Sequence, residues 1–225
     1  MDTVRPFTDR AAIASYAEDT PRKVPGYADL HRMTMLLLAE RAPRAADILV
    51  YGAGGGLELK ALADAQPEWR FAGIDPSAEM LDLAREVLGP RHTRVHLRQG
   101  YIDDAPQGPF DGATCLLTLH FLKREPRLGV LQAIRRRLKP GAPLIVAHHS
   151  CPPGSDLKTW LIRSTAFADR TGYDLAKASA SAEAMISRLP ILSSEEDEAL
   201  LRQAGFTDVA LFYAGFSFRG WIATA

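Results

Sequence analysis

Short apolar runs alternate with helical patterns along the middle of the chain, and this alternation is the strongest constraint on its fold. The runs predict strands over residues 47–51, 70–74, 94–98, 110–119 and 144–148. Apolar residues at helical spacing predict helices over residues 57–63, 80–88 and 128–138, with Ser77 as the N-cap of the second. Strands that alternate with helices form a parallel sheet with helices on both faces and right-handed crossovers. Such a sheet binds ligands in a crevice at the carboxyl ends of its strands.

The two ends of the chain depart from this alternation. Residues 206–213 and 216–223 are apolar segments joined by a short link at Ala214-Gly215, which predicts an antiparallel pair at the sheet edge. Residues 1–46 and 151–190 carry mostly helical patterns. These two helical segments are our candidates for covering the crevice and forming a substrate pocket.

We therefore expect one α/β domain that spans residues 1–225. Its parts are an N-terminal helical cap (1–46), a central core (47–150), a helical insertion (151–190) and a C-terminal helix with the antiparallel strand pair (191–225).

Charge and cysteine usage exclude several classes of protein. The chain has 27 Lys and Arg against 27 Asp and Glu, so no overall field attracts nucleic acids or anionic membranes. Cys115 and Cys151 lie in unlike settings and form no disulfide framework, which fits a reducing compartment. Asp2, Arg5 and Asp9 interrupt any apolar stretch at the start, and no run approaches membrane-spanning length. We expect a soluble cytoplasmic protein with no membrane partner.

A glycine-rich turn follows the first predicted strand. Residues 52–56 read Gly-Ala-Gly-Gly-Gly, and the missing side chains allow a tight turn and a close approach of a ligand to the backbone. Asp75 ends the second strand, where a carboxylate can accept hydrogen bonds from both hydroxyls of a ribose. A nicotinamide dinucleotide is disfavoured, because a G-x-G-x-x-G motif from Gly52 would need glycine at the position of Leu57.

Five motifs in order resemble the successive motifs of class I S-adenosylmethionine (SAM)-dependent methyltransferases. They are the glycine turn, Ile74-Asp75-Pro76, Gln99-Gly100, Leu117-Thr118-Leu119-His120 and Leu138-Lys139-Pro140-Gly141. The resemblance covers roughly residues 45 to 150 and implies a Rossmann-like, seven-stranded, mostly parallel sheet whose last strand is antiparallel. It also implies S-adenosyl-L-methionine as the cofactor.

By this resemblance, groups at the carboxyl ends of the first four strands bind the cofactor. The residues are Gly52, Ala53, Gly54, Asp75, Pro76, Met80, Gly100, Tyr101, Ile102, Leu117 and Thr118. Tyr101 and Ile102 are expected to flank the adenine, and Asp103, Asp104 or backbone groups to hold its amino group. For Met80, ordinary core packing is the alternative to contact with the purine.

One position departs from the family pattern. The family often has an acid two positions before the first glycine, and Val50 stands there in this chain. Another residue or backbone carbonyls must then bind the ammonium group of the cofactor.

Further motifs resemble the branch of this family that makes 5-oxyacetyl wobble uridine in tRNA. They are the run from Arg22 to Tyr27, the run from Leu117 to Leu122, and the aromatic C-terminal strand pair. In that branch the tyrosine after Pro-Gly reaches the cofactor, which implies this role for Tyr27; packing under the N-terminal helix is the alternative. The branch uses a carboxylated SAM held by an arginine before the final strands, whereas residues 174–190 offer only Lys177 and Arg188.

Histidines follow the fourth and fifth strands at the crevice. SAM carries an activated methyl group, so the protein mainly has to hold acceptor, methyl carbon and leaving sulfur in line. A hydroxyl acceptor would benefit from a base, and His120 and His149 are our candidates; structural hydrogen bonding is the alternative for both. Adjacent His148 and His149 point to opposite faces of a strand, and no other spacing completes a ligand set, so we expect no metal.

The sequence thus predicts a SAM-dependent methyltransferase that acts on a small-molecule O or N acceptor. A tRNA-modifying methyl- or carboxymethyltransferase and a non-catalytic SAM-binding module are the alternatives. Arg135-Arg136-Arg137 ends a predicted helix, and we expect a solvated face there rather than a nucleic-acid patch. The expected partner is a small molecule, with tRNA and a homodimer left open.

Overall fold

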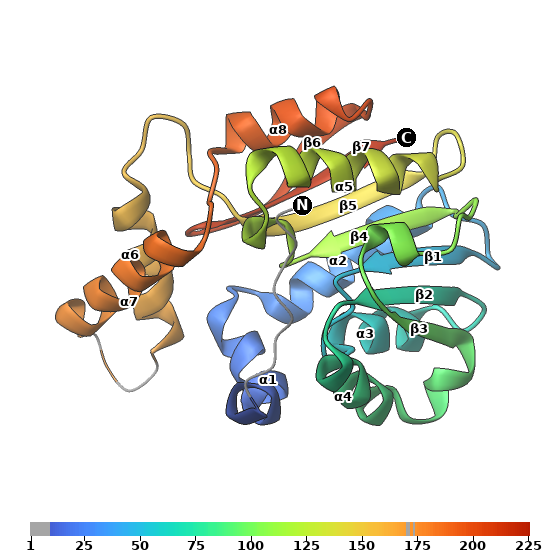
Figure 1. The fold of residues 1–225 in the computed structure, drawn as a ribbon, viewed down its shortest axis with the longest axis horizontal. Helices are drawn as coiled ribbons and strands as arrows, with labels where there is room; N and C mark the ends of the chain where they lie inside the picture. Colours follow the sequence, from blue (N-terminus) through green and yellow to red (C-terminus); the bar gives the residue numbers. More distant parts are fainter. Residues whose placement is uncertain (1–9, 170–171, 173) are drawn as a thin grey trace.

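The computed structural model describes residues 10–169, 172 and 174–225, and it shows a seven-stranded sheet between layers of helices (Figure 1). The strands are β1 (Asp47–Tyr51), β2 (Arg70–Asp75), β3 (Val95–Gln99), β4 (Gly112–Leu116), β5 (Pro143–His149), β6 (Thr207–Gly215) and β7 (Phe218–Thr224). Their order is β3-β2-β1-β4-β5-β7-β6. The first five strands pair in parallel, and β7 is antiparallel to both β5 and β6. The predicted sheet, with an antiparallel last strand, is confirmed.

Helices connect the strands and precede the sheet. They are α1 (Arg10–Lys23), α2 (Tyr27–Ala39), α3 (Leu57–Ala65), α4 (Ala78–Leu88), α5 (Arg124–Arg136), α6 (Leu157–Ala168), α7 (Leu175–Arg188) and α8 (Ser194–Gln203). Short 3-10 helices are η1 (Gly89–Arg94), η2 (Ile102–Asp104) and η3 (Leu119–Phe121). Within the described ranges, none of these helices combines the length and apolar character that crossing a membrane requires.

Alternation of side chains along the strands divides the core into two layers. In β1, Ile48 and Val50 pack with α2, α3 and α4, whereas Leu49 and Tyr51 pack with α5 and α8. Ser77 caps α4 as predicted, since its hydroxyl accepts a hydrogen bond from the Met80 N–H at 3.1 Å. Both faces of the sheet are therefore covered, and its ligand crevice has to open at the strand ends.

Some predicted boundaries are wrong. The fourth strand is shorter than the apolar run 110–119, because Leu117 adopts a positive φ of 56° and Leu119 is buried in η3 instead. Helix α5 begins before the predicted 128, because its first turn buries Arg127, a charged residue that an apolar pattern misses. Ala214-Gly215 belongs to β6, and the strand pair turns at Phe216-Ser217.

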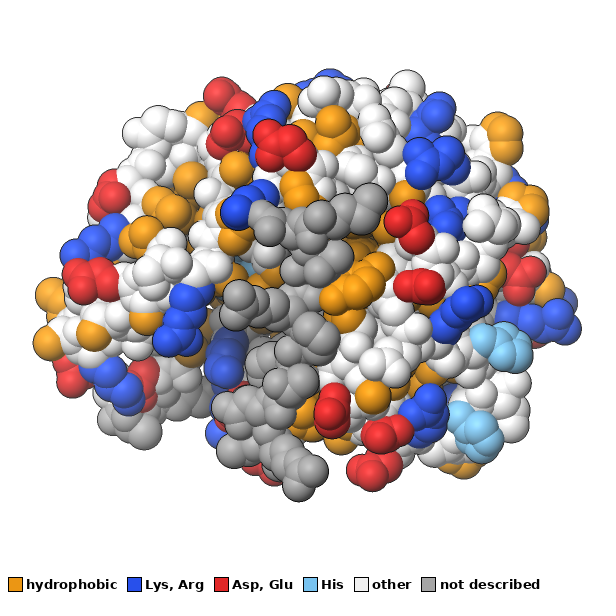
Figure 2. Space-filling model, viewed as in Figure 1, with side chains coloured by type: hydrophobic (Ala, Val, Ile, Leu, Met, Phe, Trp, Pro, Cys, Tyr) orange, Lys and Arg blue, Asp and Glu red, His pale blue; other side chains and the backbone are white. Residues whose placement is uncertain are grey.

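The arginine run at the end of α5 is the expected solvated face at Arg135 and Arg136 but not at Arg137. Arg137 is buried and donates hydrogen bonds to the carbonyl oxygens of Ala133 (2.9 Å) and Pro106 (3.2 Å), while Arg135 and Arg136 are exposed. The buried guanidinium satisfies carbonyl groups beside the helix end. On the face in Figure 2, acidic and basic side chains are intermixed among the described residues, so no single-sign field forms there.

Helices α1, α6 and α7 lie near the carboxyl ends of the parallel strands (Figure 1). Helices α6 and α7 pack together beyond the ends of β5 and β7, and α6 also contacts α1 (Figure 1). The prediction about a signal peptide concerns residues 1–9, which lie outside the described part of the chain.

Candidate functional site

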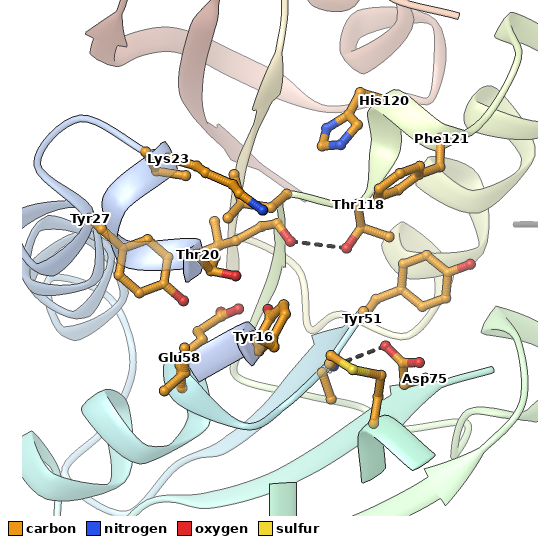
Figure 3. Close-up of a pocket in the computed structure, with 18 of the residues that line it drawn as sticks. Tyr16, Thr20, Lys23, Tyr27, Tyr51, Glu58, Asp75, Thr118, His120 and Phe121 are labelled. Atoms are coloured by element: carbon orange, nitrogen blue, oxygen red, sulfur yellow. Dashed lines mark hydrogen bonds between the residues drawn. The ribbon is translucent and has the colours of Figure 1, made fainter. Parts of the chain in front are cut away.

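A cavity of about 300 Å³ lies at the carboxyl ends of β1, β2, β4 and β5, under α1 and α2 (Figure 3). Most of the residues named from the sequence line it: Tyr27, Gly52, Ala53, Gly54, Asp75, Pro76, Met80, Leu117, Thr118, His120 and His149. Segments distant in the sequence thus meet at one place in the fold. Gly100, Tyr101 and Ile102 are not part of its wall.

The glycine turn is fastened to the second strand through Asp75. The Gly54 N–H donates to Asp75 Oδ2 and the Ser77 N–H donates to Oδ1, both at 2.9 Å. Burial raises the pKa of Asp75, and these two backbone hydrogen bonds oppose that rise. Each carboxylate oxygen keeps a second acceptor site, so Asp75 can still bind the hydroxyls of a ligand.

Gly52 brings the turn against the end of β4. Its φ is +81°, and a Cβ atom at this position would clash with Thr118 Oγ1. The Thr118 hydroxyl donates to the Leu116 carbonyl oxygen at 2.9 Å. The small residue at position 52 therefore permits close packing of two loops that line the cavity.

The residues expected around an adenine lie beside the cavity, at the end of β3. The Gly100 N–H donates to the Asp75 carbonyl oxygen at 3.0 Å, and Ile102 is buried in the core. The Tyr101 N–H donates to Asp104 Oδ2 at 2.9 Å, so the Asp104 carboxylate already has a backbone partner. The neighbouring Asp103 is exposed.

Two of the predicted histidines face the cavity and the third does not. The His149 N–H donates to His120 Nδ1 at 3.3 Å, and this acceptor role places the proton of a neutral His120 on Nε2. His149 Nδ1 lies 2.8 Å from Ser217 Oγ, which lies 2.6 Å from Ser164 Oγ. His148 points to the opposite face as predicted, with Nε2 at 3.2 Å from Asp197 Oδ1.

Burial sets the charge of these rings. It lowers the pKa of His149 to about 3, and it lowers the pKa of His120 well below the ordinary value. Burial also lowers the pKa of His31, which stacks edge-on against Tyr27, to about 4. The cavity is therefore bordered by neutral imidazoles at pH 7.

Several residues in the wall were not named as candidates from the sequence. They include Tyr16, Thr20 and Lys23 of α1, Tyr51 of β1, Glu58 of α3, Phe121 of η3 and Phe218 of β7. Tyr16 covers the glycine turn, since a Cβ at Gly55 would meet its ring at 2.8 Å. Tertiary packing brings the α1 side chains to the cavity, and no local pattern in the sequence indicates this. The sequence could have indicated Glu58, because this acid lies one turn before Leu62 and interrupts the apolar face of α3.

Glu58 is the buried carboxyl group of the cavity. Burial raises its pKa to about 7, and the nearby Thr114 hydroxyl opposes that rise. Within the described residues, neither Glu58 Oε1 nor Thr114 Oγ1 makes a hydrogen bond of ordinary length. The wall thus contains a carboxylate oxygen that has no hydrogen-bond partner in the described part of the chain.

Comparisons with known proteins point to one family. A profile of the methyltransferase domain matches residues 48–141. A carboxy-S-adenosyl-L-methionine synthase from Chromohalobacter salexigens is 29% identical over 231 residues, which cover 99% of this chain and 85% of the relative. The enzyme of the same name from Actinobacillus succinogenes is 30% identical over 211 residues, which cover 90% of this chain and 86% of the relative.

Solved structures show the same fold. Haemonchus contortus phosphoethanolamine N-methyltransferase 2, with phosphomonomethylethanolamine and S-adenosylhomocysteine, has a TM-score of 0.67 at 18% identity, covering 91% of this chain and 44% of that one. Human N-acetylserotonin methyltransferase with SAM has a TM-score of 0.59 at 16% identity, and the match covers 96% of this chain and 59% of that one. This chain spans less than two thirds of either. The 30% identical relative, the methyltransferase profile over the glycine turn and Asp75, and the shared fold agree. The chain belongs to the class I SAM-dependent methyltransferase family.

Proposed function

We propose that this protein binds SAM in the cavity and transfers its methyl group to a small-molecule acceptor. The observation that carries the proposal is the meeting of the glycine turn, Asp75 and two neutral histidines around one cavity. A lone pair of the acceptor attacks the methyl carbon, the carbon–sulfur bond breaks towards sulfur, and the acceptor's proton passes to water. Because the sulfonium is already activated, holding the two molecules in line is the main task of the protein.

Different residues of the cavity wall bind different parts of the cofactor. Asp75 accepts hydrogen bonds from the ribose hydroxyls, and the backbone at Gly52 to Gly54 lies along the cofactor. Pro76 and Met80 supply an apolar surface for the purine. Tyr27 faces the cavity from α2, in accord with the cofactor contact that its Pro-Gly-Tyr context implies.

A second cavity of about 500 Å³ offers room for the acceptor. It lies against α6 and α7 and shares Lys23, His149 and Phe218 with the first cavity. Its other wall residues include Ser164, Thr165, Asp174, Lys177 and Ser181, which suit a polar acceptor. An acceptor in this space would meet the methyl group beside His149.

The lowered pKa values of His120 and His149 favour a hydrogen-bonding role over removal of a proton. Nε2 of His120 is the protonated nitrogen and can donate to the acceptor. An acceptor that is nucleophilic without a base, such as a neutral amine, fits this arrangement best.

Formation of carboxy-SAM is a second candidate, because the relatives named carboxy-SAM synthase match this chain over nearly its whole length. In such a reaction a carboxylic acid co-substrate would release CO2 and take up the proton that the methyl group loses, and the methyl carbon would form a bond to that CO2. A carboxylated product would need a cation near the sulfonium. Among the described residues that line the first cavity, Lys23 is the only lysine or arginine. It would have to fill the role that an arginine fills in that branch.

Product analysis distinguishes these reactions. Purified protein is incubated with methyl-labelled SAM and either a small-molecule metabolite fraction, unmodified tRNA or buffer, followed by mass spectrometry. We expect S-adenosylhomocysteine and a labelled acceptor in the small-molecule arm, and neither with an Asp75→Ala variant. SAM that gains one carboxyl group would support the second candidate. Turnover with tRNA alone, or no turnover in any arm, would contradict the proposal.

A further inference from the structure

The acid that often precedes the glycine turn in this family has no counterpart at its usual position. Val50 occupies that position, is fully buried and packs in the apolar layer with α2, α3 and α4. Its neighbours across the sheet are Gly73 in β2 and Thr114 in β4, which carry no charge either. The end of β1 therefore offers no carboxylate to a cationic ligand.

Glu58 brings a carboxylate to the same cavity from another element. It lies in the first turn of α3, directly after the glycine turn, and its side chain is 7% exposed. Among the described residues no lysine, arginine or histidine forms an ion pair with it, and its Oε1 makes no hydrogen bond. A buried carboxylate that has no ion-pair partner among these residues, and one oxygen without a hydrogen bond, is energetically unfavourable, so Glu58 calls for an explanation.

The position of Glu58 in the cavity indicates what its partner is. Figure 3 shows Asp75 and Tyr51 on one side of the cavity, Glu58 and Tyr27 on the other, and Tyr16 between them. SAM carries its adenosine and its amino-acid group on opposite sides of the sulfonium, so groups on two sides of a cavity can bind them. If Asp75 holds the ribose, the amino-acid group lies on the side of Glu58.

The chemistry on that side matches a zwitterion. An ammonium group donates three hydrogen bonds, and the Glu58 carboxylate with the hydroxyl oxygens of Tyr16 and Tyr27 provides acceptors from three different helices. The amine of Lys23 points into the cavity in Figure 3 and can face the carboxylate of the same amino-acid group.

We propose that Glu58 binds the ammonium group of SAM and replaces the acid that the family carries at the position of Val50. The proposal rests on the proposed function, because it assumes that SAM occupies this cavity. It assigns a binding role to a helix residue that follows the glycine turn, in place of a strand residue that precedes it.

Calorimetric titration of the full chain with two ligands tests the proposal. SAM carries the amino-acid group, whereas 5′-methylthioadenosine has the same adenosine and thioether without it. Glu58→Gln keeps the shape of the side chain and removes its charge. Glu86→Gln, on the exposed side of α4, is the matched control. We expect Glu58→Gln to weaken SAM binding by roughly tenfold or more, as for loss of a charge-assisted hydrogen bond, with little change for 5′-methylthioadenosine.

The two ligands separate the ways in which the idea can fail. Equal losses for both ligands would show that Glu58 only shapes the cavity, and would overturn the assignment. Unchanged SAM binding in Glu58→Gln would overturn it as well, while leaving the proposed function intact. If the wild-type protein binds neither ligand, the proposed function itself fails. Retained binding of 5′-methylthioadenosine also reports that the variant is folded.

Discussion

The ionised Glu58 side chain lowers the stability of the ligand-free protein, and the same charge is what would bind a cation. In the free protein its carboxyl group lies in an apolar wall, and burial raises its pKa to about 7. The hydroxyl groups that face it, from Tyr16, Tyr27 and Thr114, stay neutral; burial raises the pKa of Tyr16 to about 12 and raises that of Tyr27 further. The charge that would bind a cation is therefore unfavourable until the cation arrives.

Because burial raises the pKa of Glu58, the stability difference between the wild type and Glu58→Gln should depend on pH. A carboxyl group with a raised folded-state pKa contributes stability below its unfolded pKa of about 4.5, and this contribution is lost as pH rises through about 7. Between pH 5 and pH 8 the ligand-free wild type should lose on the order of 3 kcal/mol relative to the variant.

Urea denaturation of both proteins at several pH values measures this difference, because all other titrating groups cancel between them. Stability curves that run parallel from pH 5 to pH 8 would show that Glu58 ionises normally.

A buried ionic cluster joins three elements behind the cavity. Arg127 of α5 forms an ion pair with Asp197 of α8, and His148 of β5 lies 3.2 Å from the same carboxylate oxygen. Arg127 also donates to the carbonyl oxygens of Leu122 (3.1 Å) and Pro190 (3.0 Å). The cluster fixes the end of β5, the strand that carries His149 on its opposite face.

Breaking this cluster should destabilise the fold. Asp197→Ala leaves Arg127 buried without its partner, and we expect a loss of roughly 3–5 kcal/mol. The exposed Glu195→Ala in the same helix is the control and should change stability far less.

The stability difference between the wild type and Asp197→Ala should decrease at low pH. Burial by itself would raise the pKa of Asp197, but His148 and Arg127 outweigh it and hold the pKa below its usual 3.8. The stabilisation by Asp197 is complete above that value and is lost as pH falls through the lower folded-state pKa. Denaturation curves from pH 6 to pH 2 measure it; a constant difference between wild type and Asp197→Ala would contradict the account.

At the scale of elements, the spacing of apolar residues predicts helices, strands and caps, but it does not predict contacts between segments that are remote in the sequence. The order of strands and helices, the Ser77 cap and the antiparallel strand pair follow from apolar spacing and turn residues, and all are present. The early start of α5 and the burial of Arg137 depend on partners that are remote in sequence, so charge patterns mislead there. For the same reason the glycine turn and Asp75 could be named, whereas Tyr16 could not.

At the scale of the molecule, strand order determines where the cavity forms. The connections from β1 and β4, which are neighbours in the sheet, lead to opposite sides, and a crevice opens between strands at such a switch point. The glycine turn follows β1, and Leu117 and Thr118 follow β4, so the sheet brings both to this crevice. Helices α1 and α2 from one end of the chain, and Phe218 from the other, close it.

The central claim is that this cavity binds SAM through the glycine turn and Asp75. Calorimetry of the ligand-free chain with SAM, and with NAD as the competing cofactor, tests it most directly. We predict one SAM site and no NAD binding. Asp75→Ala should weaken SAM binding by roughly 100-fold through loss of the ribose hydrogen bonds, while the exposed Asp82→Ala should not. Tighter binding of NAD, or SAM binding that is unchanged in Asp75→Ala, would contradict the account.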